Sequence, residues 1–144
     1  NGFQILCEAG LLPGALLHNN DRKFHCKNVY IKSENNDTLI TSLIPKGKAL
    51  KIPIAHGEGN YYIDTESLAK MNTNKQILFR YCDEKGNITS EANPNGSLEN
   101  IAGICNEGKN VFGMMPHPER AADPELENTD GKLLFESILN LVHA

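Results

Sequence analysis

Two segments of the chain carry apolar residues at helical spacing, one near each end. Residues 3–9 combine good helix formers with apolar side chains, and Gly10 supplies a C-terminal stop. In residues 131–143, one helical face collects Leu133, Leu134, Ile138, Leu141 and Val142. We therefore expect a helix that opens the chain and an amphipathic helix that closes it.

The residues between these helices alternate between extended patterns and turn signals. Apolar and β-branched runs predict strands at 26–31, 48–55, 61–63, 76–82, 101–106 and 111–115, with a short helix at 65–71. Pro53 has no N–H to donate, which restricts its strand to a sheet edge or a strand end. The turn at 107–110 predicts a hairpin between the last two strands. The order of elements indicates one α/β domain over residues 1–144 with a mixed sheet.

Charge and composition exclude several classes of function. The 14 basic and 18 acidic residues give a net charge of −4, which argues against a nucleic-acid partner. No apolar stretch approaches the roughly 18 residues of a membrane span, and no signal peptide opens the chain. The sequence predicts a soluble, cytoplasmic protein with no membrane contact.

The cysteines indicate neither a metal site nor a disulfide framework. Cys7, Cys26, Cys82 and Cys105 include no C-x-x-C pair, and no histidines cluster beside them. A chain with 40% hydrophobic residues can build a core without covalent links. We expect reduced and mostly buried thiols, and no bound metal.

His117 and Glu119 form the most informative pair in the sequence. Pro118 disfavours helical geometry at His117, so both side chains are expected on the same side of an extended segment. A carboxylate that holds an imidazole is the orienting pair of a nucleophilic triad. A surface loop with an incidental histidine is the simpler interpretation, and metal ligation lacks a third ligand.

The start of the chain is typical of the helix that follows a nucleophile. Gly2 in the first turn permits the close backbone approach of a strand-to-helix elbow, and an elbow holds its nucleophile just before the helix. That position would be the residue before Asn1. Cys105 lies in a similar run of letters, Gly-Ile-Cys-Asn, but the turn residues that follow it predict an ordinary strand cysteine.

Several motifs resemble one enzyme family in order and spacing. They are Asn1–Leu6 (NGFQIL), Gly10–Leu17 (GLLPGALL), Pro53–Gly59 (PIAHGEG), Asn93–Ser97 (NPNGS) and Gly113–Arg120 (GMMPHPER). They are similar to those of the glutaminase subunit of phosphoribosylformylglycinamidine synthase (formylglycinamide ribonucleotide amidotransferase), a class I, triad-type glutamine amidotransferase. The resemblance implies the C-terminal part of a flavodoxin-like domain with a largely parallel central sheet.

The family pattern reads Gly-Ile-Cys-Asn-Gly-Phe-Gln, whereas this sequence starts at the Asn of that pattern. The resemblance therefore implies that about 85 residues precede Asn1, with the first strands, an oxyanion loop and the nucleophilic cysteine. Either the chain was cut there, or a modified cysteine interrupts it.

The resemblance also assigns roles to individual residues. It implies that His117 is the catalytic base and that Glu119 orients it. The backbone N–H of Asn1 is expected to donate to the oxyanion, and Gln4 to contact the substrate. The remaining residues implied to hold the substrate's α-amino and α-carboxylate groups are Ala55, His56 and Glu58, although this loop could instead dock the synthase.

The implied activity is hydrolysis of L-glutamine through a cysteinyl thioester, without a cofactor in this subunit. Ammonia would pass to a large synthase subunit, with a small accessory subunit in the same complex, for purine biosynthesis. Two alternatives remain open at this point: a non-catalytic docking or regulatory domain of the same fold, and another triad-type hydrolase such as a peptidase.

Overall fold

A computed structural model describes the backbone of residues 1–142 and the side chains of residues 1–140. Five strands form the main sheet in the order β3-β2-β5-β6-β7, and β1 pairs with β4 in a separate two-stranded sheet. The strands are β1 (Ala15–Leu17), β2 (His25–Ser33), β3 (Ala49–His56), β4 (Asn60–Tyr62), β5 (Ile77–Cys82), β6 (Ile101–Cys105) and β7 (Phe112–Met114).

Three α-helices and three short 3₁₀ helices accompany the strands in the described residues. The helices are α1 (Gly2–Glu8), α2 (Thr65–Thr73), α3 (Lys132–Val142), η1 (Leu98–Asn100), η2 (Pro118–Ala121) and η3 (Pro124–Leu126). The expected helices at 3–9 and 65–71 are found, and the one expected at 131–143 is found over Lys132–Val142. The side chains of Leu141 and Val142, which we expected on its apolar face, lie outside the described residues, and so do His143 and Ala144 as a whole. No helix within the described residues is long and apolar enough to cross a membrane.

Local polar contacts explain where two of these helices begin. The side chain of Asn1 caps α1 by accepting a hydrogen bond from the N–H of Gln4 at 3.2 Å. Asp64 caps α2 in the same way, accepting from the N–H of Ser67 at 2.9 Å. Such caps satisfy N–H groups that have no partner inside the helix.

The expectation of a mixed, largely parallel sheet is wrong for this chain. Every pairing among the described strands is antiparallel. A parallel pair needs a crossover of a dozen or more residues, usually a helix. Here the short turn after Cys105 joins β6 to β7 as the expected hairpin, and residues 34–48 return the chain from β2 to β3 without a helix.

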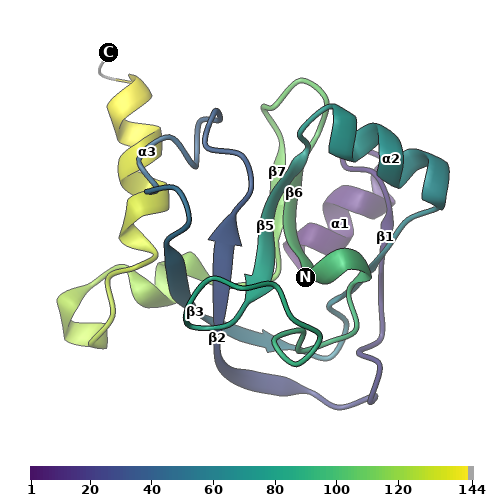
Figure 1. The fold of residues 1–144 in the computed structure, drawn as a ribbon, viewed down its shortest axis with the longest axis horizontal. Coiled ribbons are helices and arrows are strands. Elements are labelled where there is room, and N and C mark those ends of the chain that lie inside the picture. The colour runs from purple at the N-terminus through teal and green to yellow at the C-terminus, as the bar shows by residue number, and fades with distance from the viewer. Residues whose placement is uncertain (143–144) are drawn as a thin grey trace.

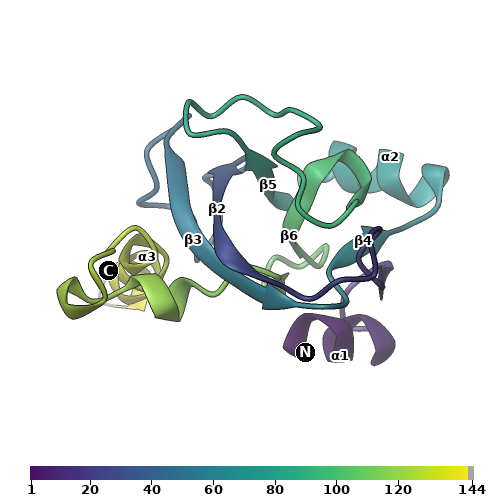
Figure 2. The ribbon, with the colours of Figure 1, turned by 90° about the horizontal axis from the view of Figure 1, so that it is seen from below.

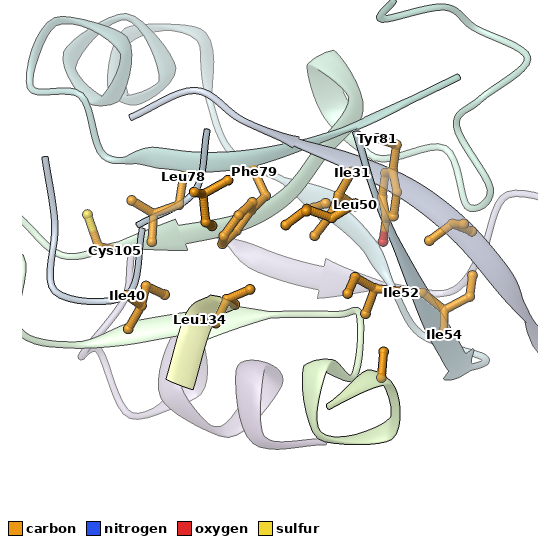
Figure 3. Close-up of a cluster of buried hydrophobic side chains, with 14 residues drawn as sticks. Ile31, Ile40, Leu50, Ile52, Ile54, Leu78, Phe79, Tyr81, Cys105 and Leu134 are labelled. Carbon is orange, nitrogen blue, oxygen red and sulfur yellow. The ribbon is translucent and has the colours of Figure 1, made fainter. Parts of the chain in front are cut away.

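Two hydrophobic clusters hold the elements together. The first lies between the main sheet and α3, where Leu134 lies opposite Phe79 (Figure 3). The second joins α1 and α2 to strands β5 and β6, with a stacked pair between Phe3 and Tyr61. Figures 1 and 2 show α1 and α3 near opposite ends of the curved sheet, with the β7 to η2 segment running between them.

The cysteines are reduced, as expected, but only two of them are buried. All four thiols are free, and Cys82 and Cys105 are buried. Cys26 is exposed, because it lies near the start of β2 where the strand pairs with the edge strand β3 and its outward face meets solvent. Cys7 is half-buried, so only two of the four thiols are buried and the expectation of mostly buried thiols is wrong.

Candidate active site

His117 and Glu119 meet at the point where the chain leaves β7 and enters η2. The Nδ1 atom of His117 lies 2.8 Å from Oε1 of Glu119. The backbone of His117 is non-helical (φ −104°, ψ 87°), as Pro118 requires, and its N–H donates to the carbonyl of Pro53 at 2.8 Å. The expectation of an extended conformation over residues 117–119 is wrong, because Glu119 lies in the first turn of η2.

This contact determines which imidazole nitrogen can act on another molecule. An ionised carboxylate has no proton to donate and can only accept hydrogen bonds. Nδ1 of His117 therefore carries the hydrogen and donates it to Glu119. Nε2 then has a free lone pair. The imidazole side chain is about one third exposed, at 31%. The pair is therefore oriented and open to solvent, which a proton-transfer group requires.

A cleft of about 670 Å³ lies beside this pair. Its walls are formed by Asn1, Gly2, Phe3, Gln4, Phe24, Ala55, His56, Gly57, Glu58, Met114, Met115 and His117. The fold thus brings six of the seven sequence-predicted site residues to one cavity. The seventh, Glu119, lies behind His117 and contacts its ring.

The start of α1 is tied directly to the loop that follows β3. The side-chain Nδ2 of Asn1 donates to the backbone carbonyl of Glu58 at 3.1 Å and lies 3.6 Å from the sulfur of Met115. Gln4, one turn along the helix, donates to Glu8 at 3.1 Å and also lines the cleft. The helix start, the loop after β3 and the segment after β7 are therefore neighbours.

His56 differs from the other cleft residues because its ring is turned into the protein. Asn95 donates to Nε2 of His56 at 3.4 Å, so Nδ1 bears the hydrogen and donates to Oδ1 of Asn19 at 3.1 Å. Burial lowers the pKa of His56 to about 4, and the nearby His25 and His117 add to the effect. A neutral imidazole with both nitrogens occupied has no free atom for a ligand.

Glu58 is the one acidic residue among the described residues that line the cleft. Its carboxylate is 40% exposed and lies 3.4 Å from Nδ1 of His18, whose own side chain is largely in solvent. An exposed pair of this kind is weakly held, so the Glu58 carboxylate can exchange His18 for another partner.

No cysteine, serine or threonine lines the cleft among the described residues. Cys105 is fully buried within β6, and burial raises the pKa of its thiol. Burial, with Glu8 nearby, raises the pKa of Cys7 to about 11. The sequence prediction that Cys105 is an ordinary strand residue is confirmed, and no thiol of the chain faces His117.

Metal binding finds no support in residues 1–142. Within that range no group of three or more histidine, cysteine, aspartate and glutamate side chains is arranged to hold an ion.

Sequence reasoning missed two features of the site. Phe24 lines the cleft although 67% of it is exposed, and a single aromatic residue in a polar stretch carries no periodic pattern. Asn19 bonds to the loop after β3 from 37 residues away. The motif Gly10–Leu17 ends just before Asn19, but the resemblance assigned no role to Asn19 itself.

Comparison with known proteins gives one consistent match. Residues 1–134 match the model of the CobB/CobQ-like glutamine amidotransferase domain. The chain is 56% identical over its whole length to phosphoribosylformylglycinamidine synthase subunit PurQ of Acaryochloris marina, covering 61% of that protein. It is 58% identical over 96% of its length to the PurQ subunit of Koribacter versatilis, covering 60% of it.

A solved structure agrees with these sequence matches. The structure of PurLQS from Thermotoga maritima contains a chain similar to this one, with a TM-score of 0.81 and 47% identity over 97% of this chain and 58% of that one. The chain spans about three fifths of the length of the curated relatives that it matches.

Proposed function

Because the chain belongs to the CobB/CobQ-like glutamine amidotransferase family, we propose that it hydrolyses L-glutamine to glutamate and ammonia as the glutaminase subunit of phosphoribosylformylglycinamidine synthase. The observation that carries the proposal is the His117–Glu119 pair at 2.8 Å, beside a cleft that the start of α1 and the loop after β3 also line. A non-catalytic docking domain would need no oriented imidazole of this kind.

The nucleophile in this scheme is a cysteine immediately before Asn1. Its support is the family elbow, in which the nucleophile precedes a helix that begins Asn-Gly-Phe-Gln. A thiol there would lie at the N-terminus of α1 and beside His117, two features that favour the thiolate. The thiol gives its proton to Nε2 of His117, which becomes an imidazolium. The thiolate then attacks the amide carbon of glutamine, and the carbonyl oxygen becomes an oxyanion. In this proposal the Asn1 backbone N–H donates a hydrogen bond to that oxyanion, because the residue after an elbow nucleophile directs its amide into the site.

His117 then moves the protons that the reaction needs. As the C–N bond breaks, its imidazolium donates a proton to the leaving nitrogen, and ammonia departs to leave a glutamyl thioester. A water molecule next gives a proton to Nε2 and attacks the thioester carbon, which releases glutamate and restores the thiol. Throughout, Glu119 keeps the ring oriented and stabilises its positive charge.

The substrate's amino-acid end is assigned to the loop of Ala55, His56 and Glu58 and to Gln4. Glu58 offers a carboxylate to the α-ammonium group, and Gln4 offers an amide to the polar substrate atoms. Because His56 has its ring bonded inside the protein, it can contribute to the cleft only through its backbone.

The ammonia acceptor is a synthase subunit that amidates formylglycinamide ribonucleotide in purine biosynthesis. Support comes from the names of the relatives, which are subunits of that synthase, and from the similar chain in the PurLQS structure. We propose the large synthase subunit and a small accessory subunit as partners. The chemistry requires no cofactor in the glutaminase subunit.

A glutamine analogue that alkylates thiols tests the proposal in the full-length protein. The adduct should be recovered by peptide mapping on the residue before Asn1, with loss of glutaminase turnover. Cys105→Ser serves as the control and should keep turnover within about threefold of the parent, because replacing a buried strand thiol costs only modest packing. Recovery of the adduct on Cys105, or absence of glutamine hydrolysis altogether, would contradict the proposal, and the second result would favour a docking domain.

A further inference from the structure

The segment from Ala55 to Gly59 (the 55–59 loop) consists of the end of β3 and the three residues that follow it, and its residues 55–58 line one wall of the cleft. Gly57 and Gly59 flank Glu58 on both sides, and glycine loses more conformational freedom on ordering than any other residue. A wall that became ordered only when substrate bound would reduce affinity by that entropy. Something in the fold must hold this loop before the substrate arrives.

The side chain of Asn19 makes four hydrogen bonds, and three of them go to this loop. Its Oδ1 accepts from the N–H of Gly59 at 3.0 Å and from the ring of His56 at 3.1 Å. Its Nδ2 donates to the carbonyl of His56 at 3.0 Å. The fourth bond, to the carbonyl of Lys23 at 2.7 Å, ties the residue to its own segment.

The backbone of Asn19 extends this hold on the loop. Its N–H donates to the carbonyl of Gly57 at 2.9 Å. Asn19 is only 1% exposed, so these bonds do not compete with solvent and leaving any of them unmade would be costly. One buried residue thus fixes polar groups of His56, Gly57 and Gly59, which lie on both sides of Glu58.

Residues 95–97 hold the same loop from its other side. The hydroxyl of Ser97 lies 3.0 Å from the carbonyl of Gly59 and accepts from the N–H of Tyr61 at 3.1 Å. Asn95 bonds to the ring of His56 and to the hydroxyl of Tyr81. The ring of His56 also packs against the backbone of Gly59, so closely that a Cβ added at Gly59 would clash with the ring.

We infer that Asn19 is a positioning residue for substrate affinity: it holds the loop of residues 55–59 in its binding geometry, so that Glu58 and the loop backbone meet the amino-acid end of the substrate without prior ordering. Asn19 does not itself touch the reacting atoms. The inference rests on the proposed glutaminase activity and adds to it a residue that acts on binding, separate from the proton transfers of His117.

The test is a comparison of KM and kcat for glutamine in the full-length protein. Asn19→Ala removes the bonds to His56 and Gly59, and we expect KM to rise at least about tenfold while kcat stays within about threefold, since an interaction used equally in ground and transition states changes KM alone. Asn19→Asp, which keeps the acceptor for Gly59 and loses the donor to His56, should fall between Asn19→Ala and the parent.

Asn35→Ala is the matched control. Asn35 is also a buried asparagine, at 5% exposure, that donates to one carbonyl and accepts from one backbone N–H, but its partners Lys75 and Asp37 lie away from the cleft. Both variants should lose stability, and only Asn19→Ala should change KM. Equal KM values for the two folded variants would overturn the inference, whereas a parent protein without glutaminase activity would instead overturn the proposed function.

A measurement on the unaltered protein covers the case in which Asn19→Ala does not fold. The N–H groups of Gly59 and Tyr61 should be protected from hydrogen exchange in the absence of glutamine, because they are bonded to the buried side chains of Asn19 and Ser97. Exchange at the rate of exposed loop amides would show that the wall is not held in advance, and the inference would then be wrong.

Discussion

His117 is held by short-range and long-range contacts of different kinds. Glu119 contacts its ring from two residues away, and Pro53 accepts its backbone N–H from the edge strand β3. The first contact sets the proton on Nδ1, and the second fixes where the residue sits relative to the cleft. An imidazole constrained at both ends loses little freedom when it transfers a proton.

Replacing His117 should therefore lower the proposed glutaminase turnover without affecting synthesis from added ammonia. In the full-length protein we expect His117→Ala to lower glutaminase turnover by at least about 10³-fold, because the nucleophile loses its base. Glu119→Gln should cost less, since an amide oxygen still accepts from Nδ1–H but stabilises the imidazolium poorly. Steady-state glutaminase assays measure both, and synthesis driven by added ammonia should survive in both. Near-normal turnover in His117→Ala would end the triad interpretation.

At the scale of elements, the junction of η2 with α3 supports the His117–Glu119 pair. The N–H of Gly131 donates to the carbonyl of Ala121 at 2.7 Å, just before α3 begins. This brings Gly131 against Pro118, the first residue of η2, so closely that an added Cβ would lie 2.2 Å from the Pro118 carbonyl oxygen. Only a residue without a side chain permits this approach.

Gly131→Ala should disturb the site from outside the cleft. The backbone of η2 must shift to admit the methyl group, and we expect a loss of about 1–3 kcal/mol in the free energy of unfolding. Turnover should fall about 10- to 100-fold, since a misplacement of about 1 Å has effects of that size. Urea unfolding and glutamine assays give the two values. Gly108→Ala, whose added Cβ would meet only the side-chain ends of Asn110 and Asn106, at 3.1 and 3.6 Å, is the control and should change neither value.

At the scale of the whole molecule, buried polar groups connect segments that the hydrophobic clusters leave apart. His56 is 4% exposed and is bonded to Asn19 and Asn95, which come from two other loops. Its ring is neutral in the folded protein because burial lowers its pKa to about 4, whereas the unfolded chain has the ordinary value of 6.5. Folding therefore excludes a proton that the unfolded chain binds between these two pH values.

The stability of the protein should consequently fall as the pH is lowered from about 6.5 to about 4. Protonation of His56 in the unfolded chain alone should remove on the order of 3 kcal/mol over this interval, with no contribution above it. Unfolding by urea at several pH values measures the slope, and His56→Gln, which does not titrate, should flatten it. Identical slopes in both proteins would contradict the expectation. Hydrogen bonds lower the pKa values of Asp64 and Asp83. Their contribution to stability is therefore constant above about pH 4 and is lost only below it, as the two carboxylates become protonated.

The parts of the molecule that the sequence determined by itself are those fixed by near neighbours. The helices, the β6–β7 hairpin, the edge position of Pro53 and the contact between His117 and Glu119 all follow from spacings of a few residues. Helical periodicity, turn chemistry and the missing N–H of proline act locally, whatever the rest of the chain does. The motifs also indicated the family, which the comparisons confirm.

Only the tertiary structure decided the strand directions and the orientation of the cleft residues. An alternating strand pattern is the same for parallel and antiparallel neighbours, so it could not exclude the parallel sheet that we expected. In the same way, the letters Ala-His-Gly-Glu do not say which side chains face the cleft. His56 turns inward because Asn19 and Asn95 satisfy both ring nitrogens, and Asn1 reaches Glu58 across 57 residues of sequence. Such contacts depend on which segments pack together, and packing is a property of the whole fold.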